Sequence, residues 1–173
     1  MGYKHLSITE FLFERGSLIS IFGSFGTGKT AIALEVANDL DGIFISSTGN
    51  EYKGRVKGKW RSKFVDVTTS YELFVAIVES VKSDPNVIVI DAINRFYRTE
   101  RKYKQLLMML NILESARGRV LLTWEMSTNN KVSGHKIMTF YSKDVFRATG
   151  RYLIGNGKRC RYVINSYGVM GCI

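Results

Sequence analysis

The sequence predicts a three-layer α/β domain with a mainly parallel central sheet and an antiparallel, β-rich C-terminal end. Short runs of apolar and β-branched residues alternate with longer segments whose apolar residues recur at helical spacing, which is the pattern of successive βαβ units. The chain then finishes in short alternating runs with tight turns, which are typical of antiparallel strands. Because the chain has 173 residues and one proline, we expect a single domain over residues 1–173.

Each expected strand is a short apolar run that ends at a glycine or a polar residue. The run NVIVID at 86–91 is almost wholly β-branched, which indicates a central strand covered on both faces. The other expected parallel strands are 17–22, 42–47, 63–69 and 119–124, and the strands expected to be antiparallel are 143–149, 158–165 and 167–173.

Three segments have the pattern of helices: 29–40, 70–83 and 102–116. The first ends before the dipeptide Asp-Gly, which is a helix stop and turn signal. The second begins with Ser70 as its expected N-cap and has Glu72 in its first turn, where a carboxylate stabilises the positive end of the helix dipole.

The composition narrows the class of partner and the compartment. The 25 basic residues outnumber the 15 acidic ones, and the net charge of +10 favours polyanionic partners such as nucleic acid. The apolar runs are far shorter than the roughly 18 residues that span a membrane, and the first residues lack a signal-peptide pattern, so we expect a cytoplasmic protein without membrane contact. Cys160 and Cys172 are expected to be free thiols, with a disulfide as the alternative in an oxidising or hyperthermophilic cell.

The segment GSFGTGKT at 23–30 fits the phosphate-loop pattern G-x-x-x-x-G-K-[ST] at every defined position. An expected strand precedes it and an expected helix follows it, as the motif requires. Its glycines let backbone N–H groups point into one concavity, and the helix N-terminus adds a positive dipole end. The residues expected to bind the nucleotide are Gly23, Ser24, Phe25, Gly26, Thr27, Gly28, Lys29 and Thr30, with Lys29 on the β- and γ-phosphates.

A phosphate-loop site also needs a carboxylate at the end of a neighbouring apolar strand, to hold Mg²⁺ through water. Asp91 supplies it, and Thr30 offers its hydroxyl to the same ion, so the expected cofactors are ATP and Mg²⁺. A GTPase is excluded because NNKVS has Ser133 where the guanine-reading motif N-K-x-D needs its Asp. A nucleotide kinase stays open, with RFYRTERKYK at 95–104 as its arginine-rich lid.

Several segments, taken in order, resemble the ATPase core of RecA-type recombinases, most closely archaeal RadB and related RadA paralogues. FERG precedes the phosphate loop, VIVIDAINRFYR is similar to the family's segment after the magnesium strand, and RVLLTWEMS is similar to its strand that ends in TNQV. SGHKIMTFYSKDVFRA resembles the segment after its second DNA-binding loop. The resemblance runs from about residue 6 to the end, and it implies a RecA-like ATP-binding core that acts in DNA recombination or repair.

Departures from this family imply weak or absent ATP hydrolysis. Where active members carry a glutamate that activates the attacking water, the matching position is Thr48, and a threonine cannot replace a carboxylate as general base. Glu51, three residues further on, is the candidate substitute. The family's γ-phosphate sensor glutamine falls at Glu125, which we expect to point away from the phosphates or to pair with Lys131 or Lys136.

Two further departures concern the chain ends. Asn165, Ser166 and Tyr167 stand where active members have a basic tract that speeds hydrolysis across a subunit interface. The match begins almost at the first residue, so we expect neither the family's N-terminal domain nor its polymerisation linker. Self-assembled filaments are therefore not expected, and a full-length recombinase is the expected protein partner. The alternatives are an active ATPase or phosphotransferase that uses Lys29 with Glu51 or Glu125 as base, and a nucleic-acid-binding module in which the nucleotide is structural.

Three basic segments are candidate DNA contacts, with single strands favoured. In 51–64 a lysine or arginine recurs at every second residue, and an extended chain would place these basic side chains on one side with Trp60 interleaved. The alternative is a solvated loop edge. In the resembling family an arginine here covers the adenine, and Arg55 is the nearest candidate. The other segments are 95–104 and 127–137. The residues expected to contact DNA are Lys57, Lys59, Arg61, Arg98, Arg101, Lys131 and Lys136.

Overall fold

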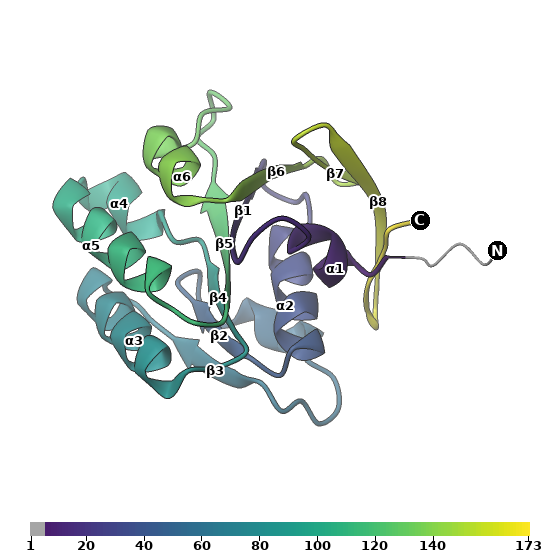
Figure 1. Cartoon of the computed structure of the whole chain (residues 1–173), viewed down its shortest axis with the longest axis horizontal. Coiled ribbons are helices and arrows are strands. Elements are labelled where there is room, and N and C mark those ends of the chain that lie inside the picture. The colour runs from purple at the N-terminus through teal and green to yellow at the C-terminus, as the bar shows by residue number, and fades with distance from the viewer. Residues whose placement is uncertain (1–5) are drawn as a thin grey trace.

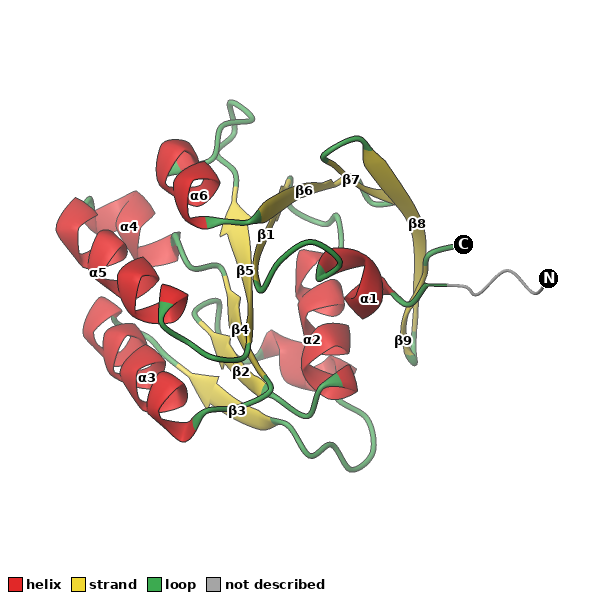
Figure 2. Ribbon diagram, viewed as in Figure 1, coloured by secondary structure: helices red, strands yellow, loops and turns green. Residues whose placement is uncertain are grey.

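Nine strands form one sheet in the part of the chain that the computed structural model describes, residues 6–173 (Figures 1 and 2). Their order across the sheet is β3-β2-β4-β5-β1-β6-β7-β8-β9. From β3 to β6 all neighbours are parallel, and β7, β8 and β9 join antiparallel. The predicted α/β class, with a mainly parallel sheet and an antiparallel C-terminal end, is confirmed.

The strands are β1 (Leu18–Gly23), β2 (Ile43–Ser46), β3 (Lys63–Asp66), β4 (Val87–Asp91), β5 (Arg119–Glu125), β6 (Asp144–Ala148), β7 (Tyr152–Gly155), β8 (Lys158–Asn165) and β9 (Gly168–Gly171). The helices are α1 (Ile8–Leu12), α2 (Lys29–Asp39), α3 (Ser70–Ser83), α4 (Arg95–Glu100), α5 (Tyr103–Glu114) and α6 (His135–Tyr141), with a 3-10 helix η1 (Glu51–Arg55). None of these helices combines the length and the apolar character that a membrane crossing needs.

Helices cover both faces of the sheet, which is why β4 is buried along its whole length. On one face, Ile32 of α2 packs in a core cluster with Val89 of β4. On the other face, Leu73 of α3 and Leu110 of α5 pack with Ile90. Successive residues of β4 thus face opposite helical layers, as the period of a strand requires. Figure 1 shows α1 and α2 on one side of the sheet and α3 and α5 on the other, while the β7–β9 end curls around α1 and α2.

The structure corrects several local predictions. The antiparallel pairing expected of 143–149 is wrong: β6 runs parallel to β1, with Ile19 opposite Asp144, because α6 first carries the chain back across the sheet. The N-cap of α3 is Thr69, whose side chain accepts a hydrogen bond from the N–H of Glu72, and not Ser70. β7, α1, α4, α6 and η1 lie outside the expected elements, since segments this short carry too few residues for a periodic signal.

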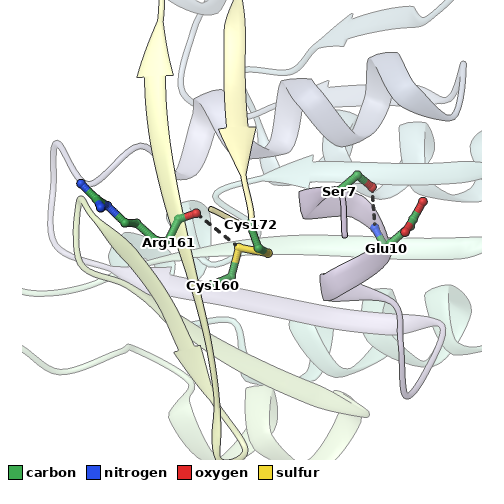
Figure 3. The surroundings of a disulfide bond; sticks show 5 residues. All are labelled: Ser7, Glu10, Cys160, Arg161 and Cys172. Carbon is green, nitrogen blue, oxygen red and sulfur yellow. Dashed lines mark hydrogen bonds between the residues drawn. A yellow bond between two sulfur atoms is a disulfide. The ribbon is translucent and has the colours of Figure 1, made fainter. Parts of the chain in front are cut away.

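The expected free thiols are also wrong, because Cys160 and Cys172 form a disulfide (Figure 3). Cys160 lies in β8 and Cys172 directly follows β9, and the hairpin register that puts Tyr162 opposite Gly171 already brings the two cysteines together. Their α-carbons are 4.9 Å apart. The disulfide therefore joins the two arms of the last hairpin. A separate backbone hydrogen bond, from the N–H of Cys172 to the carbonyl oxygen of Leu6 at 2.8 Å, holds this hairpin next to the residues before α1.

Candidate functional site

The segment between β1 and α2 has the shape of a phosphate-binding loop. Gly26 and Gly28 have left-handed φ angles of 79° and 92°, which a side chain would strain. Gly28 is the N-cap of α2, and a Cβ there would collide with the Ile164 side chain of β8. Thr27 Oγ1 donates to the Ser24 carbonyl oxygen at 2.8 Å and holds the turn. The loop therefore leads directly into a helix N-terminus, where N–H groups and the helix dipole favour an anion.

Lys29, the first residue of α2, folds back over this loop. Its Nζ donates to the carbonyl oxygens of Gly23 at 2.8 Å and Ser24 at 3.0 Å. Burial lowers the pKa of the Lys29 ammonium, while the charges of Asp91 and Glu125 oppose that shift. An ammonium held by two carbonyl oxygens beside the loop can exchange these partners for phosphate oxygens.

Asp91 ends β4, is 2% exposed and accepts short hydrogen bonds from two hydroxyls, besides a longer one from Thr48. Thr30 Oγ1 donates to its Oδ2 at 2.8 Å, and Thr123 Oγ1 donates to its Oδ1 at 2.7 Å. Burial raises the pKa of Asp91, and these hydrogen bonds with the Lys29 charge oppose the rise. A hydroxyl and a carboxylate side by side fit Mg²⁺, which takes oxygen ligands. Thr30 and Asp91 would hold this ion in place of their mutual hydrogen bond.

A cavity of about 520 Å³ lies where β1, β2, β4 and β5 end, the usual place for a site in a parallel sheet. The predicted nucleotide and metal residues that line it are Gly23, Phe25, Gly26, Gly28, Lys29, Thr30, Arg55 and Asp91. Glu51 and Glu125 line it as well, so the catalytic candidates meet in one place. Ser24 and Thr27 shape the loop but do not line the cavity.

The end of β2 presents a hydroxyl to this cavity where the resembling family has its glutamate. Thr48 Oγ1 lies 3.5 Å from Asp91 Oδ2. Glu51 begins η1 and is exposed, and its side chain makes no hydrogen bond or ion pair with any residue in 6–173. Of the described carboxylates that line the cavity, Glu51 is therefore the one whose oxygens are not already engaged.

Glu125 pairs with neither Lys131 nor Lys136, contrary to that expectation. Its Oε1 lies 3.1 Å from Arg95 Nη1, and its Oε2 lies 2.6 Å from Arg98 Nη1. Both arginines come from α4 and line the same cavity. Arg98, a predicted DNA contact, thus lies in the cavity wall, because the short helix after β4 turns its side chain toward the end of β5.

The basic run at 51–64 is not extended throughout, so its alternating lysine and arginine side chains do not all lie on one side. Its first part is the 3-10 helix η1, from which Lys53 Nζ pairs with Asp66 Oδ2 at 2.8 Å. Trp60 packs against the core on the α2 side, and its Nε1–H donates to the Lys57 carbonyl oxygen at 3.0 Å. Its ring is therefore not an open platform for stacking bases. Lys57, Lys59 and Arg61 remain exposed.

The other predicted DNA residues lie beyond the ends of β4 and β5. Arg101 follows α4, and its guanidinium lies over the Tyr97 ring, 5.8 Å from the centroid. Lys131 is exposed on the loop after β5, and Lys136 is exposed near the start of α6. The structure therefore divides the candidates into a group beside these strand ends and the group at 57–61 on the α2 side.

Three residues of the site, Asn94, Thr123 and Tyr162, have no place in the sequence-based prediction, and Arg95 was expected only as part of the basic segment 95–104. The buried Asn94 is the N-cap of the short helix α4, which has no periodic signal. Thr123 is a polar residue inside an apolar run, and this was an available signal. No local pattern in the sequence marks Tyr162 of β8 as part of the site. Its hydroxyl donates to the carbonyl oxygen of Thr27, 135 residues away, at 2.6 Å, and only the tertiary structure brings these two residues together.

A phosphate loop, an ammonium and a hydroxyl–carboxylate pair at the end of a parallel sheet define a P-loop ATPase core. The model of the ATPase family associated with various cellular activities (AAA) matches residues 19–135, and the chain belongs to this family. The crystal structure of a KaiC-like protein from the hyperthermophilic archaeon Pyrococcus horikoshii OT3 is similar, with a TM-score of 0.75 and 19% identity over 98% of this chain and 99% of that one. This likeness shows a RecA-like fold. A search of the curated proteins finds no match. The closer resemblance to RadB and RadA paralogues stays a prediction.

Proposed function

We propose that this P-loop ATPase binds ATP, acts in DNA recombination or repair, and hydrolyses ATP slowly on its own. The contact between Thr48 and Asp91 carries the proposal. A hydroxyl lies beside the metal-site carboxylate where an active enzyme needs a base for the attacking water, and a threonine hydroxyl does not take up that proton at neutral pH.

ATP would lie along the cavity with its phosphates on the loop and on Lys29. Mg²⁺, when bound to Thr30 and Asp91, would neutralise phosphate charge. Arg55 lines both this cavity and a smaller hollow of about 110 Å³ that Trp60 and Tyr167 also line. Because Arg55 lines both spaces, a nucleotide with its phosphates on the loop would extend toward Arg55.

Nucleic-acid binding is supported by charge and position. The chain carries +10, and Arg101, Lys131 and Lys136 are exposed beyond the strand ends that also form the cavity. Cations in this position can contact DNA phosphates while the nucleotide site lies behind them. If these three side chains track DNA, replacing them with Ala should weaken single-strand binding and reduce its salt dependence. The matched control replaces Lys57, Lys59 and Arg61, and a larger effect there would move the interface to the α2 side.

Steady-state ATP hydrolysis, with and without single-stranded DNA, tests the proposal together with equilibrium binding of ATP and Mg²⁺. Tight binding with turnover far below about 1 s⁻¹, the low end of ordinary enzyme rates, is expected. Unaided turnover at or above that rate would contradict slow hydrolysis. Failure of Lys29→Ala to weaken ATP binding would overturn the nucleotide site itself.

A second candidate function, an active ATPase or phosphotransferase, is favoured by the unengaged carboxylate of Glu51. In that case Glu51→Gln should reduce turnover by about 100-fold or more, the usual contribution of a general base. Glu10→Gln, at an exposed position on α1 away from the cavity, is the matched control. Residual turnover that is equal in both variants would exclude Glu51 as the base.

A further inference from the structure

The ion-paired side chains of Arg95, Arg98 and Glu125, here called the arginine cluster, form part of the cavity wall. In the sheet Glu125 is the register partner of Gly23, where the phosphate loop begins. Its charge also stabilises the Lys29 ammonium. The arginine cluster therefore lies within electrostatic reach of the groups that would hold the phosphates.

The two arginines reverse the sign of charge at this point. A lone Glu125 carboxylate would repel a phosphate chain, and the repulsion would be strong because the cavity is partly shielded from water. With Arg95 and Arg98 bound to its two oxygens, the cluster carries one net positive charge. The wall thus attracts anions.

Most of the hydrogen-bond donors of the cluster are available. Each guanidinium has five N–H donors, and each contributes only Nη1 to Glu125. Within residues 6–173 neither Arg95 nor Arg98 makes a further side-chain hydrogen bond. The remaining donors can form charge-assisted bonds to phosphate oxygens while the ion pairs with Glu125 persist.

A buried asparagine holds the cluster in place. Asn94 is 0% exposed, and its Nδ2 donates to the carbonyl oxygens of Glu125 at 3.0 Å and Ser133 at 3.1 Å. Its Oδ1 accepts from the N–H of Glu125 at 2.8 Å. The start of α4 is therefore joined to the end of β5, which fixes the backbone positions from which the two arginines and Glu125 extend.

We propose that Arg98, assisted by Arg95, contacts the terminal phosphate of a bound nucleoside triphosphate and makes the site select ATP over ADP. Glu125 is then a positioning residue that holds the two guanidinium groups. This inference rests on the proposed nucleotide function, since the loop and Lys29 hold the phosphates that ATP and ADP share. Only the terminal phosphate of ATP extends to the cluster.

Equilibrium binding of ATP and of ADP, each with Mg²⁺, to the full chain tests the selection. Arg98→Ala should weaken ATP binding about tenfold or more, the effect of one lost charge-assisted hydrogen bond, and leave ADP binding within about twofold. Arg98→Lys keeps the positive charge but loses the paired N–H donors of the guanidinium. Its preference for ATP over ADP should therefore lie between those of Arg98→Ala and the unmodified protein. Arg117→Ala is the control, since Arg117 is exposed in the turn before β5, at the far end of that strand.

Glu125→Ala separates positioning from simple charge. If Glu125 holds the arginines, its loss should lower the ratio of ATP to ADP affinity. If it merely repels phosphates, its loss should raise ATP affinity, and that result would overturn the positioning role. If Arg98→Ala and Arg98→Lys weaken ATP binding and ADP binding equally, or change neither, the proposed selection of ATP over ADP is overturned. ATP binding that is unaffected by Lys29→Ala would instead reject the underlying nucleotide site.

Discussion

The hydroxyl of Tyr162 donates a 2.6 Å hydrogen bond to the carbonyl oxygen of Thr27, which joins β8 of the C-terminal hairpin to the middle of the phosphate loop. The same hydroxyl accepts the N–H of Gly150 at 2.8 Å. Burial raises the pKa of Tyr162, so the phenol stays protonated and keeps its donor at neutral pH. The last strands of the chain therefore support the conformation of a loop near its beginning.

Tyr162→Phe should lower both stability and nucleotide affinity. It removes the donor to Thr27 and the acceptor for Gly150, and leaving buried polar groups unpaired costs about 1–3 kcal/mol. We expect a lower Tm by thermal unfolding and a several-fold weaker ATP affinity. Tyr152→Phe is the control, because the Tyr152 hydroxyl makes no hydrogen bond within residues 6–173. Equal effects of the two variants would show that the hydroxyl of Tyr162 does not support the loop.

Reduction of the disulfide should destabilise the protein. Cys160 and Cys172 are 12 residues apart, and closing a loop of that size stabilises a folded chain by about 3 kcal/mol. In a domain of this length the corresponding fall in Tm is roughly 6–12 °C. Thermal unfolding with and without a thiol reductant measures it. The double variant Cys160→Ser with Cys172→Ser should match the reduced protein, and a Tm that is unchanged by either treatment would contradict a stabilising disulfide.

Glu35 of α2 should make stability fall as the pH rises. Burial raises its pKa above the ordinary value of 4.5, Asp39 adds to the rise, and the N–H of Val169 opposes it. The folded protein therefore keeps this proton to a higher pH than the unfolded chain, so the stabilisation is full below about 4.5 and is lost as the pH rises through the folded pKa.

Glu35→Gln removes that titration and keeps an acceptor for Val169. We expect the variant to have a higher Tm than the unmodified protein at pH 7–8 and to lose this advantage toward pH 4. Glu79→Gln, at an exposed position on α3, is the control and should show no such trend. An advantage that is the same at every pH would mean that ionisation of Glu35 does not cause it.

Local patterns were sufficient for the phosphate site and for most of the sheet. The glycines of GSFGTGKT specify the turn of the phosphate loop by themselves, and the apolar run before Asp91 ends where the strand ends. Both predictions therefore depend only on consecutive residues. The same holds for the helices α2, α3 and α5, whose length is enough to show a helical period. The parallel pairing of β6 was not predictable in this way, because α6 is too short to show the helical period that indicates a crossover connection.

By itself the sequence determined the α/β class, the loop that would hold phosphates, and the Thr30 and Asp91 pair that would hold Mg²⁺. Only the tertiary structure decided which side chains share the cavity: that Glu125 is bound by Arg95 and Arg98, that Glu51 is unengaged among the described residues, and that Tyr162 holds the loop. The physical reason is distance along the chain. A strand or a glycine-rich turn is specified by a few consecutive residues, whereas these contacts arise only when packing brings separate segments to the same edge of the sheet.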